Sequence, residues 1–249
     1  MKNRLWILCC TLLPGIAGGQ TVTPLQVADN KLIIRFTNPR TESDAREILT
    51  VAANARQELA AKHDFAFAAP VEIRLSATTY EFCQMTRQPW WQASIYRDRV
   101  IYLQPLRVLR ERGILAITLR HELMHHLVEE QSQGNSPRWL SEALAIYHSG
   151  EIALLKPARR KVERAGLKWQ QLERRLAQMA NQAEAEQLYF QLYYLGQFLE
   201  TQLSIAKINR LLQRLGDKTP FTQACRELWG DDIQTIENSW LQYASEKIN

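Results

Sequence analysis

Two histidines and a glutamate in the middle of the chain have the types and spacing that metal-assisted hydrolysis needs. His121, Glu122 and His125 form an H-E-x-x-H pattern inside the run RHELMHHLVEE. On a helix, residues four apart lie on one face one turn apart, so both imidazoles can reach one Zn²⁺. The pattern predicts that His121 and His125 bind the metal and that Glu122 is the general base toward a metal-bound water. The alternative is a pair of core histidines beside a solvated glutamate.

A second segment supplies a carboxylate in an apolar context. Glu142 is the acidic residue of the run WLSEALAI, which spans 139–146. Ser136 and Pro137 are typical of a helix start and Gly150 of a helix end. A carboxylate on such an apolar helix needs a partner.

Helix geometry places Glu142 near the two histidines. If the first helix continues about six residues beyond His125 it rises about 9 Å, and five residues of the second helix return about 8 Å. With a turn around Gly134, Glu142 becomes level with His125. Two His and one Glu leave one zinc position open, as in catalytic sites. The alternative is an ion pair of Glu142 with Arg120 or Arg138.

HELMH followed by PRWLSEALAIY resembles the gluzincin metallopeptidases, most closely the small peptidase-MA-like family, whose second helix reads W-L-x-E-x-x-A. The resemblance implies a single zinc ion held by His121, His125 and Glu142, with Glu122 as general base. It also implies an edge strand, here Val100 to Gln104, that pairs with an extended peptide.

The same resemblance implies an oxyanion donor. In aminopeptidase-like gluzincins a tyrosine on a later helix stabilises the oxyanion, and Tyr189 has a similar placement, nine residues before the run Phe198-Leu199-Glu200. Tyr193, one turn later, is the second candidate. Core aromatics at helical spacing are the alternative interpretation of both.

Two further histidines are expected to lie outside the metal site. His126 points about 100° away from His125 on a helix, which indicates a surface or supporting residue. His148 is expected to be exposed near the helix end at Gly150.

The surrounding segments predict an α+β fold. Residues 31–36 and 71–75 have strand composition, 41–62 has helical periodicity, and 94–104 is typical of a hairpin turning at 97–99. Beyond Pro105 almost everything is helical in pattern. We therefore expect a small mixed α/β lobe with a short sheet (20–105), packed on a mainly helical, gluzincin-like lobe with the zinc site (106–249).

The first nineteen residues resemble a signal peptide. Lys2 and Arg4 precede an apolar run that ends at Pro14, and small residues follow at Ala17 and Gly19. This predicts export to the periplasm or the medium, with no membrane span in the mature chain. Cys83 and Cys225 would then remain, as a disulfide or as two buried thiols.

Composition excludes several classes of protein. The 249 residues are 46% hydrophobic and 23% charged, with a formal net charge of +5, which excludes a disordered, collagen-like or polytopic membrane chain. The modest charge predicts no nucleic-acid partner. The predicted function is that of an exported zinc metallopeptidase acting on peptide or protein substrates through a zinc-activated water. The alternatives are an inactive gluzincin-like binding or scaffold protein, and a zinc hydrolase of a non-peptide bond.

Overall fold

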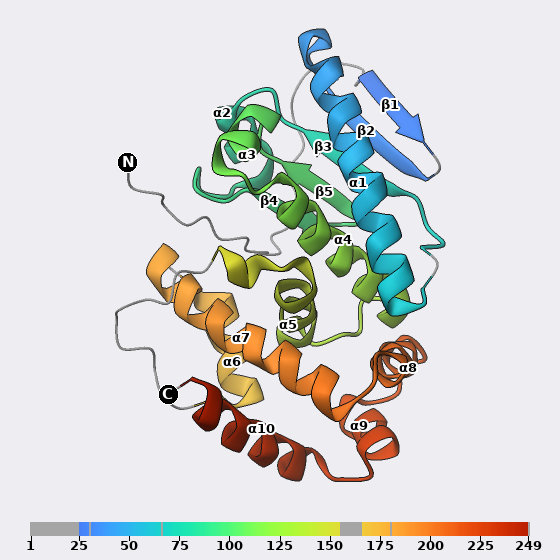
Figure 1. Ribbon diagram of the computed structural model, residues 1–249, viewed down its shortest axis with the longest axis vertical. Helices are drawn as coiled ribbons and strands as arrows, with labels where there is room; N and C mark the ends of the chain where they lie inside the picture. Colours follow the sequence, from blue (N-terminus) through green and yellow to red (C-terminus); the bar gives the residue numbers. More distant parts are fainter. Residues whose placement is uncertain (1–24, 30, 66, 155–165, 180, 249) are drawn as a thin grey trace.

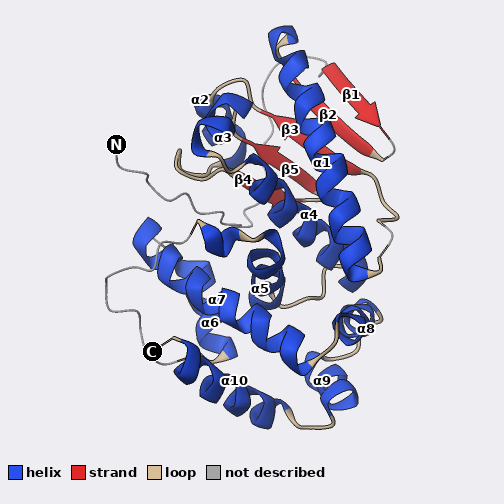
Figure 2. Cartoon of the chain, viewed as in Figure 1, coloured by secondary structure: helices blue, strands red, loops and turns tan. Residues whose placement is uncertain are grey.

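The strands are confined to the N-terminal half of the described chain, where helices alternate with them, and the C-terminal half is helical (Figure 2). The structure is a computed structural model that describes residues 25–248 except 30, 66, 155–165 and 180. In this described part no strand follows Leu103, and helices continue to Lys247. The α+β class is therefore confirmed. The predicted signal peptide lies outside the described residues.

The N-terminal half contains one five-stranded sheet and its covering helices. Its elements are β1 (Leu25–Asp29), β2 (Leu32–Phe36), η1 (Pro39–Thr41), α1 (Glu42–His63), β3 (Val71–Leu75), α2 (Thr79–Thr86), β4 (Ser94–Arg97), β5 (Val100–Leu103) and α3 (Leu106–Arg112).

The sheet is mixed, with strand order β1-β2-β3-β5-β4. β2, β3 and β5 run parallel, and β1 and β4 flank them antiparallel. Side chains alternate between buried and partly exposed along β2 and β3, as expected for a sheet with one face on the core. The edge strand next to the helical part is β4, so the expectation that Val100–Gln104 is the edge strand is wrong: β5 lies inside the sheet. The hydrophobic pattern of a short strand does not encode which neighbours it pairs with.

The β4–β5 hairpin turns through two residues with left-handed backbone, Asp98 (φ 54°) and Arg99 (φ 61°). Positive φ at both central positions is the turn geometry that matches strand twist. The predicted hairpin is confirmed, and the tight turn fixes which β4 side chains face the core.

The remaining elements are helical. They are α4 (Leu115–Ser132), α5 (Arg138–Ser149), η2 (Glu151–Ala153), α6 (Trp169–Gln178), α7 (Gln182–Gln202), α8 (Ile205–Gly216), α9 (Phe221–Trp229) and α10 (Ile233–Lys247).

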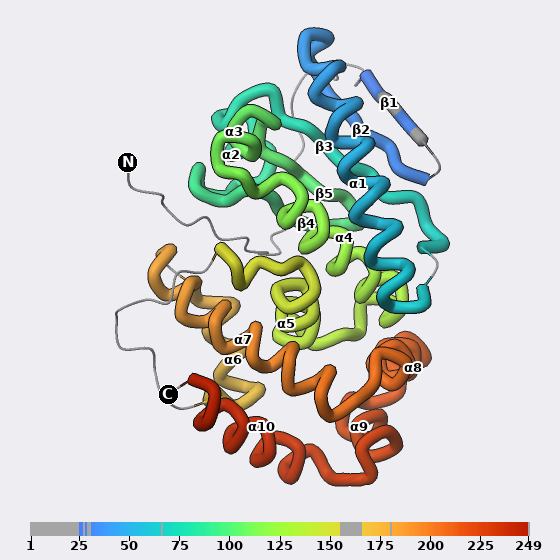
Figure 3. The backbone as a smooth tube through the Cα atoms, viewed as in Figure 1, coloured from blue at the N-terminus to red at the C-terminus, as the bar shows by residue number. Residues whose placement is uncertain are grey.

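Helix α4 is central to the molecule (Figures 1 and 3). It contacts α1 and β4 on the sheet side and α5 and α8 on the helical side. On the far side of α5, α7 crosses at Gly196, where an added Cβ would lie 2.5 Å from Tyr147 Cβ and 2.6 Å from the Ala143 carbonyl oxygen. The missing side chain of Gly196 therefore allows α7 to lie close to α5 at Ala143, the residue after Glu142.

The sequence leaves open whether Cys83 and Cys225 form a disulfide. Cys83 and Cys225 are both free thiols, on α2 and α9 at opposite ends of the molecule (Figure 1). Burial raises the pKa of Cys225 to about 12.

Among the described helices, none combines the length and the apolar character required to cross a membrane.

Candidate metal centre

The H-E-x-x-H segment forms about one and a half turns of α4, and all five of its side chains are buried. Apolar residues surround the motif, and His121 and Glu122 are both 0% exposed. A helix enclosed in this way is fixed by its packing against neighbours on several faces. The imidazoles therefore project from a rigid element.

A tight reversal follows α4 and directs α5 back along it. Gln133 (φ 51°) and Gly134 (φ 76°) both adopt left-handed backbone and donate their N–H groups to the Glu129 carbonyl oxygen. The N-cap of α5 is Pro137, without a side-chain cap, one residue later than the sequence indicates. The predicted turn at Gly134 is confirmed.

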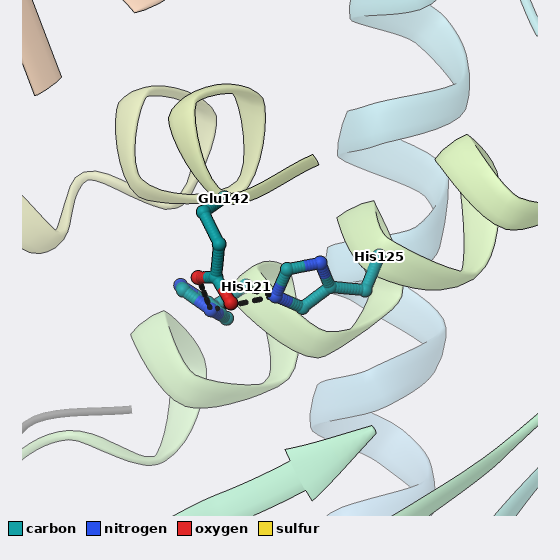
Figure 4. Close-up of side chains that lie close together, drawn as sticks. All are labelled: His121, His125 and Glu142. Atoms are coloured by element: carbon teal, nitrogen blue, oxygen red, sulfur yellow. Dashed lines mark hydrogen bonds and ion pairs between the residues drawn. The ribbon is translucent and has the colours of Figure 1, made fainter. Parts of the chain in front are cut away.

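This reversal brings Glu142 to both histidines (Figure 4). One Glu142 carboxylate oxygen lies 3.8 Å from His121 Nε2 and 3.7 Å from His125 Nε2, and the two Nε2 atoms are 3.0 Å apart. Arg138 Nε is 4.0 Å from the other oxygen of Glu142. The histidines are thus closer to this carboxylate than the arginine of the ion-pair alternative.

Each histidine is oriented through its other ring nitrogen. His121 Nδ1 lies 2.9 Å from a carboxylate oxygen of Glu151, and His125 Nδ1 lies 2.8 Å from the Ser141 hydroxyl. The Glu151 carboxylate only accepts, so His121 Nδ1 carries the hydrogen, and the same tautomer suits His125. The two Nε2 atoms share a hydrogen bond of 3.0 Å. Once that hydrogen is lost, both Nε2 atoms would be free to donate lone pairs to a metal ion, as in metal sites whose histidines are held through the other ring nitrogen.

The cluster attracts positive charge. Both Glu142 oxygens are buried and have no hydrogen-bond partner among the described residues. Burial opposes the charged form of His121, yet the carboxylates of Glu151, Glu122 and Glu142 together outweigh it and raise the pKa of His121 to about 9. Burial, followed by the charge of His121, holds the pKa of His125 well below its ordinary value.

The distances also suit a metal ion. Four-coordinate zinc with bonds of about 2.0–2.1 Å separates its ligand atoms by about 3.3–3.4 Å. The three ligand atoms here all lie within 4.8 Å of one another. The buried His121–His125–Glu142 group could therefore hold one metal ion after small side-chain movements.

Glu122 is held beside the cluster. Its Oε1 accepts a hydrogen bond of 2.5 Å from the Ser94 hydroxyl. Burial raises the pKa of Glu122 to about 7, against the lowering effects of His121 and Ser94. A carboxylate with a pKa near neutrality suits transfer of a proton in either direction.

A pocket of about 530 Å³ opens onto the cluster. Among its lining residues are the metal-facing His125 and Glu142, the edge-strand residue Tyr96, and Arg138 at the start of α5. The Tyr96 ring stacks on His125 with 6.3 Å between centroids and an interplanar angle of 18°. One wall of the pocket is therefore the end of β4.

The structure does not bring Tyr189 to this pocket. Its side chain is 0% exposed and belongs to the hydrophobic core, and it is not among the lining residues. The equally buried His121 and Glu122 differ from it, because their side chains contact other residues of the site. Tyr193 packs partly buried against Tyr147, away from the cluster. The catalytic role of either tyrosine stays a prediction.

The three remaining histidines, His63, His126 and His148, are also buried. His126 is 1% exposed, with Nδ1 3.2 Å from the Tyr96 hydroxyl, so it supports the wall of the pocket. The expectation that His148 is exposed is wrong. It is 7% exposed and meets His63 of α1 edge to face at 4.2 Å, because the ends of α1 and α5 pack together.

Four residues of the site were not found from sequence: Ser94, Tyr96, Ser141 and Glu151. Ser94 and Tyr96 come from a strand remote from the motif, so no local spacing links them to it. Glu151 gives one signal, an acidic residue directly after the glycine that ends α5.

Comparisons with known proteins add no family. No protein-family model matches the chain, and no curated protein matches it. The likeness to gluzincins thus rests on the motif residues, and the chemistry of the site is argued from its geometry.

Proposed function

We propose that the protein is a zinc-dependent peptidase. The observation that carries the proposal is the buried His121–His125–Glu142 cluster, which has Glu122 one residue from a ligand and opens into a pocket bounded by an edge strand. Two imidazoles, neutral when they bind the metal, and one carboxylate, with one position left open, are the donor set of catalytic zinc.

The chemistry divides between the metal and the chain. When bound, a zinc ion would lower the pKa of a water molecule and polarise the scissile carbonyl. Glu122 would take the proton as water adds to the carbonyl carbon. It would then return that proton to the leaving amine nitrogen as the C–N bond breaks.

The position of β4 supports a peptide rather than a small ester or amide as substrate. β4 pairs with β5 on one side and is the outermost strand of the sheet on the other. An extended peptide can add to such an edge through backbone hydrogen bonds. Tyr96, near the end of this strand, lines the pocket together with His125 and Glu142.

The test combines metal analysis with digestion of a peptide library by the purified mature chain. We expect one zinc per chain, strongly reduced zinc in His121→Ala and Glu142→Ala, and full zinc in His148→Phe, a buried histidine outside the cluster. Glu122→Gln should retain zinc and lose hydrolysis, because an amide cannot take the proton. Full zinc occupancy in both ligand variants, or native turnover by Glu122→Gln, would contradict the proposal.

A further inference from the structure

Ser94 and Glu122 form a buried pair between the edge strand and the metal-site helix. Both side chains are 0% exposed, and the Ser94 hydroxyl donates to Glu122 Oε1 at 2.5 Å. Hydrogen bonds to a carboxylate at this distance are short and among the stronger ones in proteins. Ser94 is the one hydrogen-bond partner of the Glu122 side chain among the described residues.

The two oxygens of this carboxylate have different surroundings. Oε1 is occupied by Ser94, whereas Oε2 is buried and has no hydrogen-bond partner in the described part of the chain. A buried polar atom without a partner is costly and calls for a ligand, a water or a catalytic role. Oε2 is therefore the oxygen that remains to exchange protons.

We propose that Ser94 is a positioning residue of the reaction, whose hydroxyl fixes Oε1 of Glu122 so that Oε2 alone serves as the proton acceptor and donor. The inference rests on the proposed function. The proton released by the attacking water would pass to Oε2 and from there to the leaving nitrogen, while the bond to Ser94 prevents rotation of the carboxylate. Preorganisation of this kind raises the rate without strengthening substrate binding.

The fold provides the alignment that this role requires. Ser94 and Tyr96 point to the same side of β4, since side chains alternate along a strand. They meet Glu122 and His126, one turn apart on α4. The step from Ser94 to Tyr96 along the strand is about 6.7 Å, and the step from Glu122 to His126 along the helix is about 6 Å. The two spacings nearly match, so both hydrogen bonds can form at once. The strand is thereby aligned with the helix at two points.

The backbone of Ser94 is fixed as well. Ser94 pairs with Leu103 in the antiparallel ladder, and the neighbouring Gln104 N–H donates to the Ala93 carbonyl oxygen at 3.0 Å. Ile95, between the two hydroxyl residues, packs on the opposite face with Phe82 and Tyr102. The hydroxyl of Ser94 is thus presented to Glu122 by a strand held on both faces.

The first experiment compares Ser94→Ala and Ser94→Thr with wild type at full zinc occupancy, using a peptide taken from the library digest. Ser94→Ala should lower kcat by about 10- to 100-fold with KM near native. Ser94→Thr keeps the hydroxyl and should recover most of the rate. Ser76→Ala is the matched control: its hydroxyl is buried without a partner among the described residues, so kcat should stay native.

The second experiment separates positioning from packing by a double-mutant cycle of Ser94→Ala with Glu122→Asp, read out in kcat and in melting temperature. Glu122→Asp keeps a carboxylate but shortens its reach toward Ser94. If Ser94 acts through the carboxylate, its removal should cost little further rate in the Glu122→Asp background. Coupling in melting temperature alone, with additive effects on kcat, would show a merely structural pair and overturn the proposal. Native kcat in Ser94→Ala beside an inactive Glu122→Gln would overturn it too. If Glu122→Gln itself is fully active, the proposed function fails, and this inference with it.

Discussion

Glu151 holds the first histidine of the candidate metal cluster: one of its carboxylate oxygens lies 2.9 Å from His121 Nδ1, and both side chains are 0% exposed. Glu151 follows Gly150, which ends α5 in left-handed backbone (φ 79°). Helix α5 therefore carries Glu142 of the cluster. Glu151, just beyond the end of the same helix, supplies a second carboxylate on the opposite side of the His121 ring.

Glu151→Gln should weaken zinc binding by about 10- to 100-fold, the usual effect of losing an outer carboxylate partner of a ligating histidine. The amide preserves size but removes the charge that favours the correct tautomer. Competition with a chromogenic chelator measures the affinity. Glu129→Gln, an acidic residue of the pocket wall outside the cluster, serves as control. Equal affinities in the two variants would show that Glu151 has no role in orienting His121.

Stability should fall on acidification through the buried pair His63 and His148. Burial, followed by nearby positive charge, lowers the pKa of His63 to about 4 and that of His148 to about 2, both below the unfolded value of 6.5. The unfolded chain then binds more protons below pH 6.5, so the free energy of unfolding decreases as the pH falls from 6.5 toward 4. The loss is on the order of 2 kcal/mol per histidine by pH 5.

Urea denaturation of wild type and of the double variant His63→Phe, His148→Phe at pH 8 and pH 5 checks this prediction. Phenylalanine keeps the edge-to-face packing and cannot titrate. The difference between wild type and variant isolates the pair from other titrating groups, including the metal ligands. An identical pH dependence in both proteins would exclude the pair as its source.

Tyr189→Phe distinguishes an oxyanion donor from a core aromatic. Glu122 adjoins His121 in sequence and is held by Ser94. Tyr189 instead packs within the hydrophobic core, so we expect Tyr189→Phe to change the melting temperature and leave kcat near native. A drop in kcat of about 10²–10³ at unchanged stability would instead establish the phenol as a transition-state donor. Tyr193→Phe, measured in parallel, shows whether the neighbouring turn of α7 contributes.

Gly196→Ala should destabilise the protein by about 1–3 kcal/mol through overpacking, despite the better helix propensity of alanine. The new methyl group would meet Tyr147 and the backbone of Ala143, next to Glu142, so zinc affinity should decrease as well. Thr201→Ala, at an exposed position of the same helix, is the control for both measurements. A Gly196→Ala protein with native stability would show that α7 can move away from α5 at little cost.

Local patterns were sufficient to predict much of the centre. The spacing of His121 and His125 and the turn near Gly134 both act within a few residues, so helix geometry alone could bring Glu142 to the histidines. The order of the strands depends on parallel pairing between distant segments, and it placed β4 rather than β5 at the edge. His148 is buried because it packs against His63 at the end of α1, more than eighty residues away in sequence. Such tertiary contacts leave no periodic signal in one segment.

Two hydroxyl contacts, Ser94 with Glu122 and Tyr96 with His126, connect β4 to α4, so a displacement of the strand is transmitted to the helix. A peptide that added to the outer edge in the wrong register would strain this strand, and the strain would reach the Glu122 carboxylate through Ser94. Poorly matched sequences would then bind but turn over slowly. Selectivity among peptides would be expressed in kcat more than in KM, as a series of single-residue substitutions in one cleaved peptide can show.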